Sequence, residues 1–82
     1  MKITRDLIKE WVDIGYEIEF EYKGKEYSIT YFVENGKEYI SFCEYNKEPI
    51  DVETADELCD IPLDGKTLLE VLQEVGYDNI SY

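Results

Sequence analysis

Residues 16–43 read YEIEFEYKGKEYSITYFVENGKEYISFC, and this stretch decides the fold. It contains three runs in which apolar and polar residues alternate, the pattern of half-buried β-strands. Lys23-Gly24 and Asn35-Gly36 separate the runs, and both predict two-residue hairpin turns, with Asn-Gly the stronger signal. Together the turns predict a three-stranded antiparallel meander.

The two predicted turns also set the register of the strands. Each turn determines which residues lie opposite each other, and the same apolar face then runs across all three strands. A slip of one residue in either hairpin would destroy this agreement. The expected apolar pairs are Phe20 with Tyr27, Ile18 with Ile29, Tyr16 with Tyr31, Tyr31 with Ile40, and Ile29 with Phe42.

The opposite face of the meander is expected to be polar and to carry a row of glutamates on its first, edge strand. Glu17, Glu19 and Glu21 alternate with apolar residues, and alternate side chains of a strand point to opposite faces. The other two strands add mostly small polar side chains to this face, with Phe32 and Tyr39 as an aromatic pair. One face therefore packs on helices and the other faces solvent.

Helices are predicted before and after the meander. Thr4 and Thr54 are suitable N-cap residues, and Gly15 and Gly76 are suitable helix ends. Pro62 separates the second helix from the third. The expected helices run from about Arg5 to Ile14, from about Ala55 to Cys59, and from Asp64 or Thr67 to about Val75.

The element order is α-β-β-β-(α)-α, which predicts an α+β fold in which one two-layer domain spans residues 1–82. The tail from Tyr77 to Tyr82 is expected to be a short extended segment. Double-stranded RNA-binding domains share this order of elements. Their basic loop and helix start correspond here to Asp60, Asp64, Gly65 and a single Lys66, so the phosphate contacts that RNA binding needs are missing.

The charge of the chain excludes several classes of partner. The net charge is -12, from twenty acids and eight bases, and residues 48–64 hold seven acids and no base. Such a field repels nucleic acid and anionic membranes and attracts basic surfaces. No run approaches the roughly 20 apolar residues of a membrane span, and the N-terminus does not have the pattern of a signal peptide, so we expect a cytoplasmic protein.

No motif for catalysis, a metal or a cofactor is complete in this sequence. Asp64-Gly65-Lys66-Thr67 resembles the end of a phosphate loop, but Asp60 stands where its first glycine should be. A calcium loop beginning at Asp60 would have Pro62 at its third position and Val71 at its twelfth. The chain has no histidine to activate a nucleophile or to ligate zinc. We therefore expect no enzyme, no cofactor and no metal site.

The two cysteines, Cys43 and Cys59, form no CxxC pair. In a reducing compartment they are expected to be free thiols. The sequence also allows a disulfide between them.

The glutamate row has two interpretations. Charge on an edge strand prevents sheets from pairing edge to edge, and this structural role needs no partner. Alternatively, carboxylates spaced roughly 6.6–6.8 Å apart along a strand resemble successive phosphates, and they can enter a basic groove built for nucleic acid. On this hypothesis the partner-binding residues are Glu17, Glu19, Glu21, Glu53, Asp56, Glu57 and Asp60.

In organisation the chain resembles the small acidic anti-CRISPR proteins that mimic DNA at the PAM-reading groove of type II effectors. The resemblance rests on the Asp6-Leu7-Ile8 helix, the meander, the acidic helices that follow it and the overall charge. It implies a phage or mobile-element inhibitor whose acids contact arginine and lysine of a nuclease. No residue of the family carries over individually.

We therefore expect a non-catalytic interaction protein that binds a basic protein surface. One alternative is a regulatory or structural module anchored by the surface aromatics Phe32, Tyr39 and Tyr45. A second alternative is a small enzyme of unknown chemistry.

Overall fold

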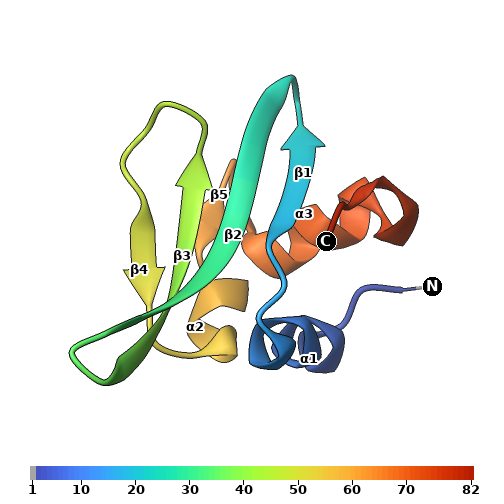
Figure 1. Ribbon diagram of the computed structural model, residues 1–82. Helices are drawn as coiled ribbons and strands as arrows, with labels where there is room; N and C mark the ends of the chain where they lie inside the picture. Colours follow the sequence, from blue (N-terminus) through green and yellow to red (C-terminus); the bar gives the residue numbers. More distant parts are fainter. Residues whose placement is uncertain (1) are drawn as a thin grey trace.

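The sheet predicted from the hairpin turns lies at the centre of the structure, a computed structural model that describes residues 2–82. Four strands lie side by side in the order β1-β2-β3-β4, each antiparallel to its neighbour (Figure 1). Their bounds are β1 Ile18–Tyr22, β2 Lys25–Glu34, β3 Lys37–Glu44 and β4 Ile50–Val52. The α+β fold is confirmed, and this sheet has one strand more than predicted.

The register of both hairpins is also confirmed. Lys23 and Asn35 have φ values of 51° and 53°, as the first residue of a type I′ turn requires. Each is followed by a glycine that also has a positive φ. The apolar pairs are Ile18 with Ile29, Phe20 with Tyr27, Ile29 with Phe42, and Tyr31 with Ile40.

The prediction was wrong at the start of the first strand, which begins at Ile18 rather than Tyr16. The Tyr16 amide instead donates to the Trp11 carbonyl at 3.1 Å, which holds this part of the chain against the end of the first helix. Tyr16 therefore does not pair with Tyr31, and Glu17 lies just before the strand.

The fourth strand, β4, is too short to show an alternating pattern, and it follows Pro49. Its three residues pair with Ile40, Ser41 and Phe42 of β3. The strand exists because β3 offers it a partner, which is tertiary information.

The three helices have the predicted caps. Their bounds are α1 Arg5–Ile14, α2 Ala55–Cys59 and α3 Leu68–Val75. Of the two candidate caps for α3, Thr67 is the one used, in a full capping box with Glu70. Gly15 ends α1 in the left-handed conformation, with φ 89°.

Asp64 has a different role from a helix cap. It begins the two-residue turn of a small hairpin, β5 Pro62–Leu63 and β6 Lys66–Thr67, with φ 54°. Its carboxylate forms an ion pair with Lys23, which lies in the turn between β1 and β2. Two turns far apart in the sequence are thereby joined.

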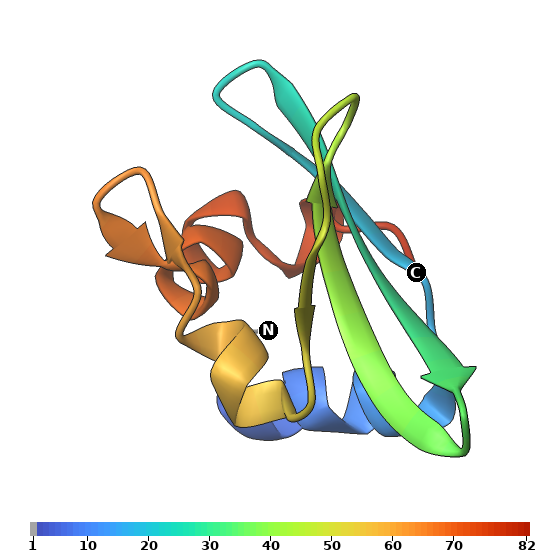
Figure 2. The same cartoon turned by 90° about the vertical axis from the view of Figure 1, so that its left-hand side faces the viewer.

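The helices lie on one side of the sheet and leave the other side uncovered (Figure 2). Alternate residues of β1 to β3 point into the core, where Ile18, Ile29, Leu58, Leu68 and Leu72 are at most 1 % exposed. We call the uncovered side the open face. Within residues 2–82, no helix combines the length and the apolar character needed to cross a membrane.

The C-terminal tail closes part of the β1 edge. Residues Tyr77–Asn79 form a 3-10 turn rather than the predicted extended segment. Only Ser81 is paired as a strand would be, and its backbone exchanges hydrogen bonds of 2.8 and 2.9 Å with Glu19. Tyr82 stacks on the buried Trp11, with ring centroids 4.6 Å apart.

Candidate functional site

Two rows of side chains cross the open face near the turn between β1 and β2. In the first row, Glu21 lies opposite Glu26, and the next strand brings Tyr45 beside Glu26 through a 2.9 Å backbone hydrogen bond. In the second row, Ser81, Glu19, Ser28 and Cys43 lie side by side. Residues on successive strands that share a row point to the same face.

These rows border a shallow hollow of about 500 Å³. Its polar side chains belong to Glu19, Glu21, Glu26, Ser28, Asn79 and Ser81, and its aromatic wall includes Tyr45. Tyr45 is 70 % exposed, the highest value among the large hydrophobic residues. We call this site the acidic hollow.

The three carboxylates of the acidic hollow have no internal partner. Within residues 2–82, the side chains of Glu19, Glu21 and Glu26 form neither an ion pair nor a hydrogen bond. Glu21 and Glu26 form the type of antiparallel pair that lies between two hydrogen-bonded pairs, where side chains approach most closely. Like charges placed directly opposite each other destabilise a sheet. A bound cation would relieve this repulsion.

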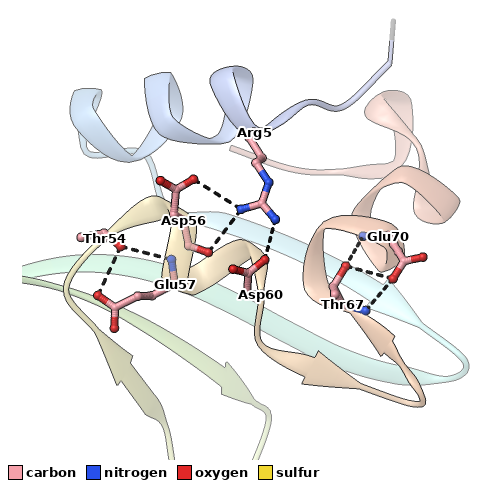
Figure 3. Close-up of polar contacts among 7 residues, drawn as sticks. All are labelled: Arg5, Thr54, Asp56, Glu57, Asp60, Thr67 and Glu70. Atoms are coloured by element: carbon pink, nitrogen blue, oxygen red, sulfur yellow. Dashed lines mark hydrogen bonds and ion pairs between the residues drawn. The ribbon is translucent and has the colours of Figure 1, made fainter.

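The remaining predicted acids lie elsewhere, and most already have partners. Arg5 binds Asp56 at 3.3 Å and Asp60 at 2.5 Å, and the Asp60 carboxylate raises the pKa of the Arg5 guanidinium (Figure 3). Lys37 binds Glu53 at 2.6 Å. These carboxylates therefore hold α1, α2 and the β2–β3 hairpin in place.

Glu57 takes part in the start of α2. Its amide donates to the Thr54 hydroxyl at 3.1 Å, and its carboxylate accepts from the same hydroxyl at 3.2 Å (Figure 3). Glu17 is exposed and precedes β1. Of the seven predicted acids, the structure brings only Glu19 and Glu21 into the acidic hollow.

Sequence reasoning missed Glu26, Ser28 and Ser81 as members of this site. Glu26 and Ser28 were accessible from the register, because the first turn places them opposite Glu21 and Glu19. The signal for Glu26 was the alternation of apolar and polar residues along β2, which continues back to the turn between β1 and β2. Ser81 has no such signal, since its position depends on how the tail folds back.

The surface aromatics do not form one patch. Phe32 and Tyr39 stack on each other with ring centroids 5.3 Å apart. Tyr45 lies beside Glu26 of β2. Glu26 and Phe32 are six residues apart on this strand, a distance of about 20 Å. Tyr45 therefore belongs with the acidic hollow.

Both cysteines are free, so the disulfide left open by the sequence is not formed. Cys59 is buried in the core, and this burial raises the pKa of its thiol to about 11. Cys43 is half-buried on the open face, with its Sγ 3.2 Å from the Lys47 carbonyl. In the part of the chain that the structure describes, no three carboxylates or thiols are grouped so as to hold a metal ion.

Comparison of the chain with protein-family models, with curated proteins and with solved structures finds no match.

Proposed function

We propose that this chain is a non-catalytic protein that binds a basic surface of a partner protein through the acidic hollow. The observation that carries the proposal is the trio of unpaired carboxylates, Glu19, Glu21 and Glu26, beside the exposed ring of Tyr45. Lysine and arginine are the side chains that such a site favours, since carboxylates bind their charge and a tyrosine face binds a cation.

Protection of the sheet edge fits Glu21, whose backbone points away from β2, but it does not explain the whole trio. Glu26 lies on β2, which is paired with β1 on one side and continues its pairing with β3 as far as Tyr45 on the other. A residue on an inner strand has no edge to protect. At Glu19 the edge is already closed by the backbone of Ser81. Partner binding accounts for the charge of Glu26, which edge protection leaves unexplained.

Each ion pair formed at such a site is expected to contribute a modest binding free energy, and several together contribute more. Single exposed ion pairs contribute about 0.2–1 kcal/mol each. The net charge of -12 adds long-range attraction, which raises the rate of association with a basic partner at low ionic strength.

The class of partner that we propose is a nucleic-acid-binding enzyme. Glu19 and Glu21 repeat along β1 at roughly 6.6–6.8 Å, a spacing similar to that of phosphates on one strand. The resemblance to anti-CRISPR inhibitors makes a nuclease groove the first surface to test. We place this activity in the cytoplasm, which suits two free thiols.

Affinity capture tests the proposal. The chain is immobilised, exposed to a bacterial lysate at low ionic strength and eluted with a salt gradient. A second column carries the triple variant Glu19→Gln, Glu21→Gln, Glu26→Gln, and a third carries Glu10→Gln, Glu48→Gln, Asp51→Asn, which removes the same charge at exposed positions elsewhere.

We expect basic proteins, nucleic-acid enzymes among them, to be retained on the first and third columns and lost from the second. Equal retention on all three columns would refute the acidic hollow as the binding site. Retention that salt does not reverse would favour the aromatic-anchored alternative instead.

A further inference from the structure

A second unpartnered surface lies at the other end of the sheet, along β2. This strand runs to Glu34, but its neighbour β1 begins only opposite Ile29. The last five residues of β2 therefore have β3 on one side and no strand of the described chain on the other, and the β2–β3 hairpin extends beyond β1 (Figure 1).

The hydrogen-bonding pattern identifies the backbone groups on this bare edge. Residues of an antiparallel strand direct their N–H and C=O groups alternately to the two sides. The two-residue turn makes Glu34 and Lys37 a hydrogen-bonded pair, so Phe32 and Thr30 also point toward β3. Tyr31 and Val33 must then point away from β3. Within residues 2–82, no backbone hydrogen bond engages them on that side.

The other edges of the sheet are charged or closed. On β1, the outward-pointing backbone of Glu19 is taken by Ser81, and the next outward residue is Glu21. On β4, the outward residue is Asp51. Among the sheet edges of residues 2–82, only the β2 edge has two consecutive outward-pointing residues with uncharged side chains, with Tyr31 36 % and Val33 57 % exposed.

The surroundings of this edge are acidic. Tyr31 lines a hollow of about 410 Å³ between α1 and the β2–β3 hairpin, whose lining has five carboxylates, Asp13 and Glu38 among them, against two bases, Arg5 and Lys9. The Tyr31 hydroxyl donates to Glu38 at 2.7 Å. Glu34 follows at the end of the strand. A strand added here would lie between carboxylates, so charge complementarity favours a cationic one.

We propose that the backbone of Tyr31 and Val33 is a docking point for an extended, cationic segment of another protein, which adds a strand to β2. Such addition forms main-chain hydrogen bonds and places alternate side chains on the host surface. The cationic character of the partner rests on the proposed function, whereas the mode of binding rests on the bare edge.

A second copy of this chain does not fit the same edge. An antiparallel pair that uses all four backbone groups places Tyr31 opposite Val33 of the second copy. The Asn35-Gly36 turn of that copy would then lie beside Ile29, where Ile18 already lies. Two chains of net charge -12 also repel each other. Any partner segment must leave the β2 edge before Ile29, where β1 begins to pair, and a short strand satisfies this condition.

Amide hydrogen exchange followed by NMR tests the docking point. The probe is a blocked hexapeptide that alternates valine and lysine, and its control alternates valine and threonine. In the free protein the amides of Tyr31 and Val33 should exchange rapidly, unlike that of Ile29, which is paired with β1. The lysine peptide should protect both amides, and the threonine peptide should bind more weakly.

A proline substitution supplies the matched variant. Val33→Pro removes one outward-pointing donor and leaves the ladder to β3 intact, as proline does on an edge strand. It should weaken binding of the lysine peptide by about fivefold, the equivalent of one hydrogen bond. Asp51→Pro removes the corresponding donor on the β4 edge and should leave binding unchanged.

The proposal is overturned if the lysine peptide leaves the amides of Tyr31 and Val33 unprotected, a measurement that needs no variant. Equal binding of the threonine peptide would overturn the cationic assignment. The acidic hollow is monitored separately through the amides of Glu21 and Ser28. If the lysine peptide protects only the amides of the hollow, this inference is wrong and the proposed function stands. If it protects only the amides of Tyr31 and Val33, the proposed function is wrong and this inference stands.

Discussion

Glu21 and Glu26 face each other across β1 and β2 with no cation between them in the described chain. Nearby lysines are engaged elsewhere, because Lys23 binds Asp64 and Lys25 binds Glu44. A like-charged pair of this kind costs stability. Its presence is understandable if the repulsion is relieved when a partner binds.

Removing one of these two charges should therefore stabilise the protein. We expect Glu26→Gln to raise the free energy of unfolding by about 0.2–1 kcal/mol, because it removes the cross-strand repulsion. Urea denaturation monitored by circular dichroism measures the change. Glu53→Gln is the control, since it removes the same charge but breaks the ion pair with Lys37, and it should not stabilise. A loss of stability in Glu26→Gln that equals or exceeds the loss in Glu53→Gln would contradict the account.

The two thiols should differ in reactivity for reasons of position. Cys59 is fully buried, and a pKa of about 11 keeps its thiol protonated at pH 8. We expect a thiol reagent at pH 8 to label Cys43 in the native protein and to label Cys59 only on unfolding, since the thiolate is the reactive form. Mass spectrometry of the digested protein assigns the label. Native labelling of Cys59 at the rate of Cys43 would contradict the packing of α2.

At the scale of elements, the first half of the chain was predictable because its determinants are local. Asn35-Gly36 and the alternation on either side of it determine a hairpin without reference to the rest of the molecule. Thr4 and Gly15 delimit α1 in the same way. Elements that depend on a distant partner were missed or misassigned: β4, the pairing of Ser81 and the start of β1.

The β5–β6 hairpin was not predicted either, although the sequence contains a signal for it. Asp64-Gly65 is a favoured pair for a two-residue hairpin turn, but from the sequence Asp64 was considered as a helix cap and as part of a phosphate loop, and not as a turn residue. Strands of two residues are too short to show alternation, so the turn alone had to identify them.

The capping box of α3 should contribute measurably to stability. The helix buries Leu68, Val71 and Leu72 completely, and Thr67 accepts a hydrogen bond from the Glu70 amide at 3.3 Å. We expect Thr67→Ala to lower the free energy of unfolding by about 1 kcal/mol at pH 7. Thermal and urea denaturation test this expectation. An unchanged midpoint would show that packing alone determines where α3 begins.

The contribution of this cap should also depend on pH. Hydrogen bonds from the Thr67 backbone and side chain lower the pKa of Glu70 below its ordinary value of 4.5. A carboxylate with a lowered pKa in the folded state stabilises the fold above its unfolded pKa and loses this effect as the pH falls through the folded pKa. The difference in stability between the native chain and Thr67→Ala should therefore narrow below pH 4.5. A difference that widens with acid would contradict the assignment.

At the scale of the whole molecule, the charges divide into structural and free groups. Six of the twenty carboxylates form ion pairs in the described chain, and they use five of the eight bases. The sequence indicated the excess of acid but not this division, because the two groups have the same composition. From the sequence Asp56 and Asp60 are predicted to bind a partner, whereas in the structure both bind Arg5.

Because free acids outnumber free bases, salt should stabilise the isolated protein. Sodium chloride screens the repulsion among exposed carboxylates, so we expect the melting temperature to rise between low and physiological ionic strength at pH 7. Differential scanning calorimetry measures it. Binding to a basic partner should show the opposite dependence and weaken with salt. A melting temperature that falls with added salt would mean that the internal ion pairs outweigh the repulsion.

The central claim is that the acidic hollow, rather than the overall charge, binds the partner. The most direct measurement is the affinity of a deca-arginine peptide, by isothermal titration calorimetry at low ionic strength, for two charge-reversed variants. One carries Glu19→Lys, Glu21→Lys and Glu26→Lys, and the other carries Glu10→Lys, Glu48→Lys and Asp51→Lys. We predict that the first variant binds roughly tenfold or more weakly than the second, because both have the same net charge and only the first loses the hollow. Equal affinities would contradict the claim.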